Sequence, residues 1–150
     1  ELDIHGFTLV GKADRMDRDA TGGLVVVDYK TGAPPTTPQV ETGLAPQLAL
    51  EAAMAKRGAF PGVAAGAPLA GLLYVQLSGG RTPGQEKPVK LDAEEAASNA
   101  YEGLAKLIHK FADEKTPYLS RPRPMFESRF GDYDHLARVQ EWSAGGEDGE

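Results

Sequence analysis

The stretch from Leu24 to Lys30, which reads Leu-Val-Val-Val-Asp-Tyr-Lys, decides the fold. Its consecutive valines predict a β-strand, and an unbroken apolar run is typical of a strand that is buried on both faces. Two charged residues, Asp28 and Lys30, come at the end of this run. Burying charges is costly unless they serve a purpose. The stretch therefore indicates the central strand of a sheet with helices outside it and a functional site at its end.

A second acidic residue is expected close to Asp28. The segment from Phe7 to Asp14 alternates as a strand does, and Asp19 to Gly23 has the composition of a turn. Suppose that these segments form a hairpin with the strand from Leu24 to Lys30. The numbers of two residues that face each other across the hairpin then sum to about 41 or 42, so Asp14 lies opposite or nearly opposite Asp28. Directly opposed Cβ atoms are roughly 4.5–5.5 Å apart. Two carboxylates at that separation repel unless a proton or a cation relieves them, and a hard divalent cation would suit their oxygens.

The lysine at the end of the strand completes the pattern. Side chains alternate along a strand, so Asp28 and Lys30 share one face, and Tyr29 is predicted to point into the core. Lys30 then stands about 6.6 Å along the strand from the acidic pair. There an ammonium group can hold or help deprotonate a water molecule and neutralise charge on a phosphate. Taken alone, Asp-x-Lys could equally be a surface ion pair, and the second aspartate favours the functional interpretation.

The remaining patterns predict an α/β fold: a three-layer arrangement with a central mixed sheet flanked by helices. The expected elements follow in order along the chain. They are a helix from Pro46 to Arg57, a strand from Leu69 to Leu77, an exposed loop from Ser78 to Pro88, a short edge strand from Val89 to Leu91, a helix from the Asp92 cap to Pro117 with an apolar stripe at Ala97, Tyr101, Leu104, Ile108 and Phe111, and a last helix from Asp132 to Trp142.

Length and composition limit the possibilities. With 150 residues, one domain is expected over residues 1–143, followed by a disordered acidic tail over 144–150. The opening residues suggest a fragment of a longer protein. There is no cysteine, so an iron–sulfur cluster held by thiolates is excluded, and no apolar run is long enough for a membrane span. These features are compatible with a cytoplasmic protein. The net charge of -6 argues mildly against a free-standing nucleic-acid binder.

Several motifs together resemble a known family. They are Gly11 to Asp17 (Gly-Lys-Ala-Asp-Arg-Met-Asp), Val25 to Gly32 (Val-Val-Val-Asp-Tyr-Lys-Thr-Gly) and Gln47 at the start of a helix. The combination resembles the RecB-like nuclease domain of the PD-(D/E)xK superfamily. The segments Ala45 to Glu51 and Tyr118 to Pro122 look most like the C-terminal nuclease domain of AddB-type double-strand-break repair proteins. The resemblance covers nearly the whole chain.

The resemblance implies roles for individual residues. Asp14 and Asp28 would bind Mg²⁺, or Mn²⁺, together with the backbone carbonyl of Tyr29, and Lys30 would be the catalytic lysine. Gln47 would match the family's Gln-x-x-x-Tyr motif and contact DNA. In the basic stretch beyond the long helix, Arg121 and Arg123 are further candidates for DNA contact, although a solvated loop explains them equally well.

The sequence departs from the family pattern in three places. A His or Glu ligand usually precedes the first strand, on an N-terminal helix that this chain does not include, and His5 is a poor substitute for it. Glu51 stands where the motif has Tyr, and we expect it to be solvated, although it could add an acidic group near the metal. The four cysteines that hold an iron–sulfur cluster in many AddB-type nucleases are absent.

The expected function is Mg²⁺-dependent hydrolysis of DNA, with an AddA-like helicase-nuclease subunit as partner. The fragment itself could be inactive, because part of the metal shell would be missing. One alternative is a non-catalytic module that binds DNA or a helicase through a degenerate nuclease fold. Another is a phosphohydrolase that acts on small nucleotides.

Overall fold

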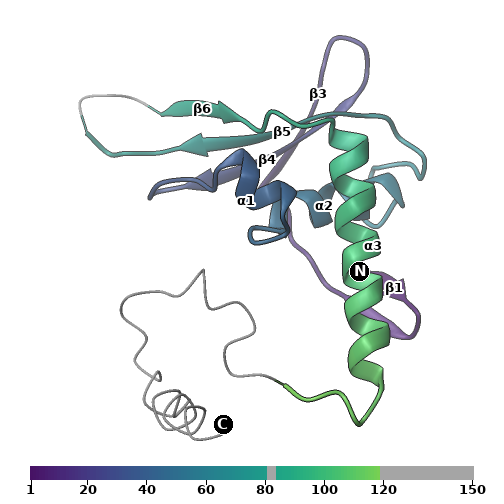
Figure 1. The fold of residues 1–150 in the computed structure, drawn as a ribbon. Coiled ribbons are helices and arrows are strands. Elements are labelled where there is room, and N and C mark those ends of the chain that lie inside the picture. Colours follow the sequence, from purple (N-terminus) through teal and green to yellow (C-terminus); the bar gives the residue numbers. More distant parts are fainter. Residues whose placement is uncertain (81–83, 119–150) are drawn as a thin grey trace, which may run out of the picture. The chain divides into compact units, whose positions relative to one another are not determined.

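The computed structural model describes residues 1–80 and 84–118, and residues Glu1–Ala112 form one compact unit that contains every element below. Figure 1 shows these elements in chain order. They are β1 (Leu2–Ile4), β2 (Phe7–Leu9), β3 (Arg15–Arg18), β4 (Leu24–Lys30), α1 (Thr37–Glu41), α2 (Gln47–Lys56), β5 (Leu69–Gln76), β6 (Gln85–Pro88) and α3 (Ala93–Ala112).

A four-stranded mixed sheet in the order β3-β4-β5-β6 forms the centre of this unit. Strand β4 pairs antiparallel with β3 and parallel with β5, and β6 pairs antiparallel with the far side of β5. The Val-rich run is therefore a central strand, as predicted, with Val26 and Val27 fully buried. The fold class is confirmed: the protein is an α/β domain whose mixed sheet is flanked by helices.

The main core lies between one face of the sheet and helices α2 and α3. Leu24 and Val26 of β4 share this face with Leu72 and Tyr74 of β5, because paired residues of neighbouring strands point to the same side. Helix α2 brings Leu48 and a series of alanines against them, and small side chains allow a helix to lie close to its neighbours. As a result, α2 is held firmly beside the end of β4.

The predicted bounds of α2 hold to within a residue. Pro46 immediately precedes the helix, and Arg57 and Gly58 follow its end. At the start of α3, the Asp92 carboxylate accepts a hydrogen bond of 2.8 Å from the backbone N–H of Glu95, as the capping pattern predicts. The apolar stripe of α3 is only partly core, because Ala97 is buried whereas Phe111 is exposed.

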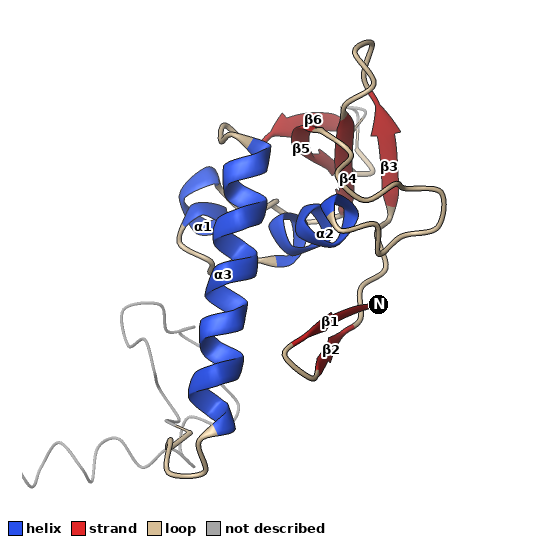
Figure 2. Cartoon of the chain, turned by 90° about the vertical axis from the view of Figure 1, so that its right-hand side faces the viewer, coloured by secondary structure: helices blue, strands red, loops and turns tan. Residues whose placement is uncertain are grey.

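The predicted strand from Phe7 to Asp14 is wrong. Only its first residues form a strand, β2, which pairs with β1 in a separate hairpin, and the strand that pairs with β4 is β3, which begins only at Arg15 (Figure 2). His5 and Gly6 both have positive φ angles and form the tight turn of the first hairpin. The predicted register nevertheless holds. Arg15 pairs with Val27, so one further step along the ladder corresponds to Asp14 opposite Asp28.

The predicted position of the edge strand is also wrong. It is β6, from Gln85 to Pro88, where a loop was expected, and not Val89 to Leu91. All the residues of β6 are exposed, so hydrophobicity gives no signal for it, whereas Val89 is buried just beyond the strand. The predicted helix from Asp132 to Trp142, the boundary at 143 and the tail over 144–150 lie outside the described residues. Among the described helices, none is long and apolar enough to cross a bilayer.

Substituting Leu48 by Ala is expected to destabilise the domain by about 2–5 kcal/mol, because a fully buried leucine would leave a cavity between α2 and the sheet. Denaturant unfolding measures this loss. Leu107→Ala on α3 is the matched control, since that side chain is half exposed, and it should cost less than about 1 kcal/mol. Equal losses in the two variants would contradict the described packing of α2.

Candidate active site

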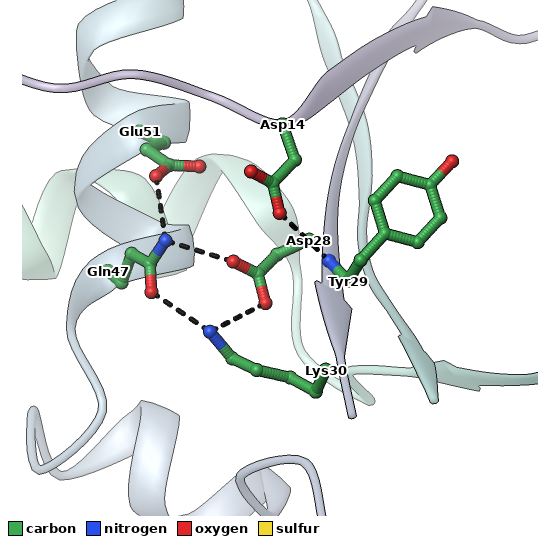
Figure 3. A network of polar contacts seen from close by, with 6 residues as sticks. All are labelled: Asp14, Asp28, Tyr29, Lys30, Gln47 and Glu51. Carbon is green, nitrogen blue, oxygen red and sulfur yellow. Dashed lines mark hydrogen bonds and ion pairs between the residues drawn. The ribbon is translucent and has the colours of Figure 1, made fainter. Parts of the chain in front are cut away.

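Polar side chains from three segments gather where β4 ends (Figure 3). Asp14 lies just before β3, and Asp28 and Lys30 are among the last residues of β4. Gln47 begins α2, and Glu51 follows one helical turn later on the same face of that helix. The central strand and the helix packed on it thus supply most of the site.

Asp28 is the buried centre of this group, with only 2% of its surface exposed. Its Oδ1 accepts a hydrogen bond of 2.9 Å from Gln47 Nε2, and its Oδ2 forms an ion pair of 2.8 Å with Lys30 Nζ. Lys30 Nζ in turn donates to Gln47 Oε1 at 3.2 Å. Asp28 and Lys30 therefore share one face, as alternation along the strand predicts, and Gln47 links them in a closed ring of contacts.

The amide of Gln47 can take only one orientation here. Its nitrogen donates to Asp28 and also to Glu51 Oε1, at 3.1 Å, while its oxygen accepts from the Lys30 ammonium. A flipped amide would place its oxygen against two carboxylates and its N–H groups against a cation. The orientation of Gln47 is thus fixed by the charges around it.

Asp14 approaches from the outer strand. It is exposed, and its Oδ2 accepts a hydrogen bond of 3.1 Å from the backbone N–H of Tyr29. That bond holds the Asp14 carboxylate beside the chain between Asp28 and Lys30. The structure therefore brings the two predicted aspartates and the predicted lysine together, with Gln47 beside them.

Glu51 corrects one expectation. It is not solvated, because only 5% of its surface is exposed, and its Oε2 is buried without a hydrogen-bond partner among the described residues. Burial raises the pKa of Glu51. The Gln47 hydrogen bond opposes that increase, whereas the charges of Asp28 and Asp14 add to it. The sequence did contain a signal, since Glu51 is the lone charge within an otherwise apolar run from Leu48 to Ala55.

The interpretation of Tyr29 as a core residue is wrong. Its side chain is 38% exposed, and its hydroxyl accepts a hydrogen bond of 3.1 Å from Arg15, which also pairs with Asp17 at 2.8 Å. Arg15 and Asp17 both lie within β3. The aromatic ring buried beneath the site is Tyr74, paired with Asp28. Burial raises its pKa to about 12, and the charges of Asp28 and Glu51 contribute.

Other candidates stay predictions. The proposed DNA contacts Arg121 and Arg123 lie outside the described residues. His5 is exposed at the turn between β1 and β2. The role of the Tyr29 carbonyl as a ligand is likewise not tested.

The donor set suits a hard divalent cation. Asp14, Asp28 and Glu51 bring three carboxylates to the end of β4. The buried oxygens Asp28 Oδ2 and Glu51 Oε2 accept no hydrogen bond in the described chain beyond the ion pair of Asp28 with Lys30. In the part of the chain that is described, no three acidic or histidine side chains converge closely enough to hold an ion as they stand. Gln47 and Lys30 instead engage the carboxylates, and they would have to share these oxygens with a metal.

The protein is an α/β domain with a helix-flanked mixed sheet. Its carboxylates and one lysine gather at the end of a central strand of that sheet. The chain belongs to the PD-(D/E)XK nuclease superfamily, whose model matches residues 1–124. The fold is consistent with the restriction-endonuclease-like architecture of that superfamily. Membership indicates nuclease-type hydrolase activity, and such nucleases typically use divalent metals.

Similar proteins occur in Rickettsia. An uncharacterized protein of Rickettsia bellii is 28% identical over 90% of this chain, which spans 17% of that protein. An uncharacterized protein of Rickettsia conorii is 38% identical over 35% of this chain and 6% of its own length. An uncharacterized protein of Rickettsia felis is 38% identical over 39% of this chain and 7% of its own length. No solved structure matches. The chain thus corresponds to a small part of each of these much longer relatives.

Proposed function

We propose that this chain is a Mg²⁺-dependent DNA nuclease domain that hydrolyses phosphodiester bonds. The observation that carries the proposal is the buried Asp28 paired with Lys30 at the end of the central strand, in a chain of the PD-(D/E)XK superfamily. Burying a carboxylate to this degree costs free energy even when an ammonium pairs with it, and such costly buried charges cluster at functional sites. Asp14 lies next to the pair and can complete an acidic site for Mg²⁺ or Mn²⁺.

The residues divide the chemistry among them. A bound Mg²⁺ supplies charge stabilisation at the phosphate and lowers the pKa of water. Asp28 and Asp14 would hold that ion. The Lys30 side chain is 31% exposed, so its ammonium can orient water and neutralise charge on the phosphate oxygens. In the reaction, a water oxygen bonds to phosphorus and one ester P–O bond breaks. The leaving oxygen takes up a proton, giving a phosphomonoester end and a hydroxyl end.

Gln47 has the position of a substrate-facing group. It is exposed at the rim of the site, and its amide already contacts both Asp28 and Lys30. We infer that it orients DNA relative to these two residues. Arg121 and Arg123 are proposed to add contacts to the phosphate backbone.

We further propose that the domain acts in the processing of double-strand-break ends, as an exonuclease within a cytoplasmic helicase–nuclease complex. The AddB-like motifs support this role. The chain covers only 17% of the Rickettsia bellii relative, which also supports it, because a domain of a long protein can act beside other functional domains. An AddA-like subunit would be the partner.

Metal dependence is the direct test. Linear DNA should be degraded in Mg²⁺, degradation should stop in EDTA, and excess Mg²⁺ should restore it. Closed circular DNA of the same sequence should resist, as expected of an exonuclease, and mononucleotides should not be hydrolysed. Cleavage that persists in EDTA, or hydrolysis of nucleotides alone, would refute the proposal. DNA binding without cleavage in Mg²⁺ or Mn²⁺ would instead support the non-catalytic module. That alternative is considered because, among the described residues, no three acidic or histidine side chains lie close enough together to hold an ion as they stand.

A further inference from the structure

Among the described residues, Glu51 is the one buried acidic group to which the proposed chemistry gives no role. It sits on the face of α2 that packs towards the sheet, between the buried residues Leu48 and Ala52. Its Oε2 is enclosed without a partner among the described residues. Leaving a carboxylate oxygen in that state costs free energy, and coordination of a cation would remove that cost.

The charges around Glu51 point the same way. Asp14, Asp28 and Glu51 can contribute three negative charges, and Lys30 is the cation in contact with this group in Figure 3. One ammonium leaves the cluster with an excess of negative charge. A divalent cation would offset the excess of two charges, whereas a monovalent ion would leave one of them.

The geometry also brings Glu51 and Asp28 to one point. A single nitrogen, Gln47 Nε2, lies 2.9 Å from Asp28 Oδ1 and 3.1 Å from Glu51 Oε1, so both carboxylates face the same position. Figure 3 shows the carboxylates of Glu51 and Asp14 pointing toward one another beside Asp28. Asp28 and Glu51 thus face one position beside α2, and Asp14 approaches it from the start of β3, so a small adjustment of these side chains would let all three reach one ion.

We propose that Glu51 is a third carboxylate ligand of the metal site, supplied by α2. The inference rests on the proposed function, since it assumes the metal that Asp14 and Asp28 would hold. It departs from a purely structural role, in which Glu51 would only orient the amide of Gln47. A glutamine side chain at this position could still accept the hydrogen bond from Gln47, so that role survives Glu51→Gln, whereas charge-based ligation does not.

Mn²⁺ binding to the full chain, measured by calorimetric titration without DNA, tests the inference. Glu51→Gln should weaken Mn²⁺ binding at least about tenfold and reduce the rise in melting temperature that Mn²⁺ causes. Glu41→Gln, at an exposed position on α1, is the matched control and should bind as the unaltered chain does. If Glu51→Gln does not fold, Glu51→Met, of similar size and without a ligand atom of this kind, serves in its place with the same expected loss.

Asp28→Asn separates the two levels of the argument. If Asp28→Asn abolishes Mn²⁺ binding while both Glu51 variants bind like the unaltered chain, the inference about Glu51 is overturned and the proposed function stands. If Asp28→Asn itself leaves Mn²⁺ binding intact, the metal site, and with it the proposed function, is overturned. Loss of binding in both sets of variants supports both.

Discussion

Asp28→Asn is expected to lower the rate of DNA cleavage by at least about 10³-fold, because charge stabilisation by a bound metal contributes several kcal/mol to the transition state. The substitution keeps the shape of the side chain. The amide oxygen of the introduced asparagine can still accept the hydrogen bond from Gln47 Nε2, so the loss should come from the missing charge and not from unfolding. Initial rates of release of soluble nucleotides from end-labelled linear DNA measure the effect.

Asp17→Asn is the control for this experiment. Asp17 lies on the neighbouring strand β3 and pairs with Arg15 on the surface, so its loss should change the cleavage rate less than about threefold. Melting temperatures of both variants check that the fold persists. Cleavage by Asp28→Asn at the rate of the unaltered chain would remove the basis for the proposed active site.

The parts of the fold that sequence predicted well are those set by local chemistry. The valines of β4 require a buried strand, and Asp19 forms the expected turn by accepting hydrogen bonds from Thr21 and Gly23. The hairpin register follows from that turn, so the closeness of Asp14 and Asp28 could be predicted without knowing the rest of the fold. Likewise, Pro46 and Gly58 mark the ends of α2 almost to the residue.

The errors have a common physical origin in packing between distant segments. Alternation from Phe7 to Asp14 looked like one strand, but the chain at Gly11 passes so close to α2 that a Cβ there would lie 2.8 Å from Met54 Sδ. Alternation predicts a core position for Tyr29 because it points the side chain away from Asp28, yet that face of β4 is open at its end and Tyr29 contacts Arg15 there. Neither contact leaves a local pattern in the sequence.

Glu51 shows why the composition of the site was harder to predict than its location. Helical spacing places it on the face of Gln47, but the same spacing is compatible with exposure. Only the position of α2 against β4 decides that this face is turned inward. The site is consequently graded in burial, with Asp28 and Glu51 at its base and Asp14 and Gln47 at its rim. A substrate would reach the rim first.

Lys30→Met separates catalysis from metal binding. Removing the ammonium should lower the cleavage rate by about 10²–10³-fold, the usual cost of losing one group that stabilises charge in the transition state. Metal binding should not weaken. Lys30 Nζ lies 2.8 Å from Asp28 Oδ2, so its cation competes with a metal for that oxygen. Mn²⁺ should therefore bind Lys30→Met at least as tightly as it binds the unaltered chain.

The contrast between the two variants identifies the role of the lysine. Asp28→Asn should lose both Mn²⁺ affinity and cleavage, whereas Lys30→Met should lose cleavage alone. Lys30→Arg is the matched control for charge, and it should remain impaired, because a planar guanidinium cannot keep the short contacts that one ammonium makes with both Asp28 and Gln47. If Lys30→Met instead bound Mn²⁺ more weakly and recovered full cleavage at high Mn²⁺, the lysine would serve to organise the metal site and would take no direct part in the reaction.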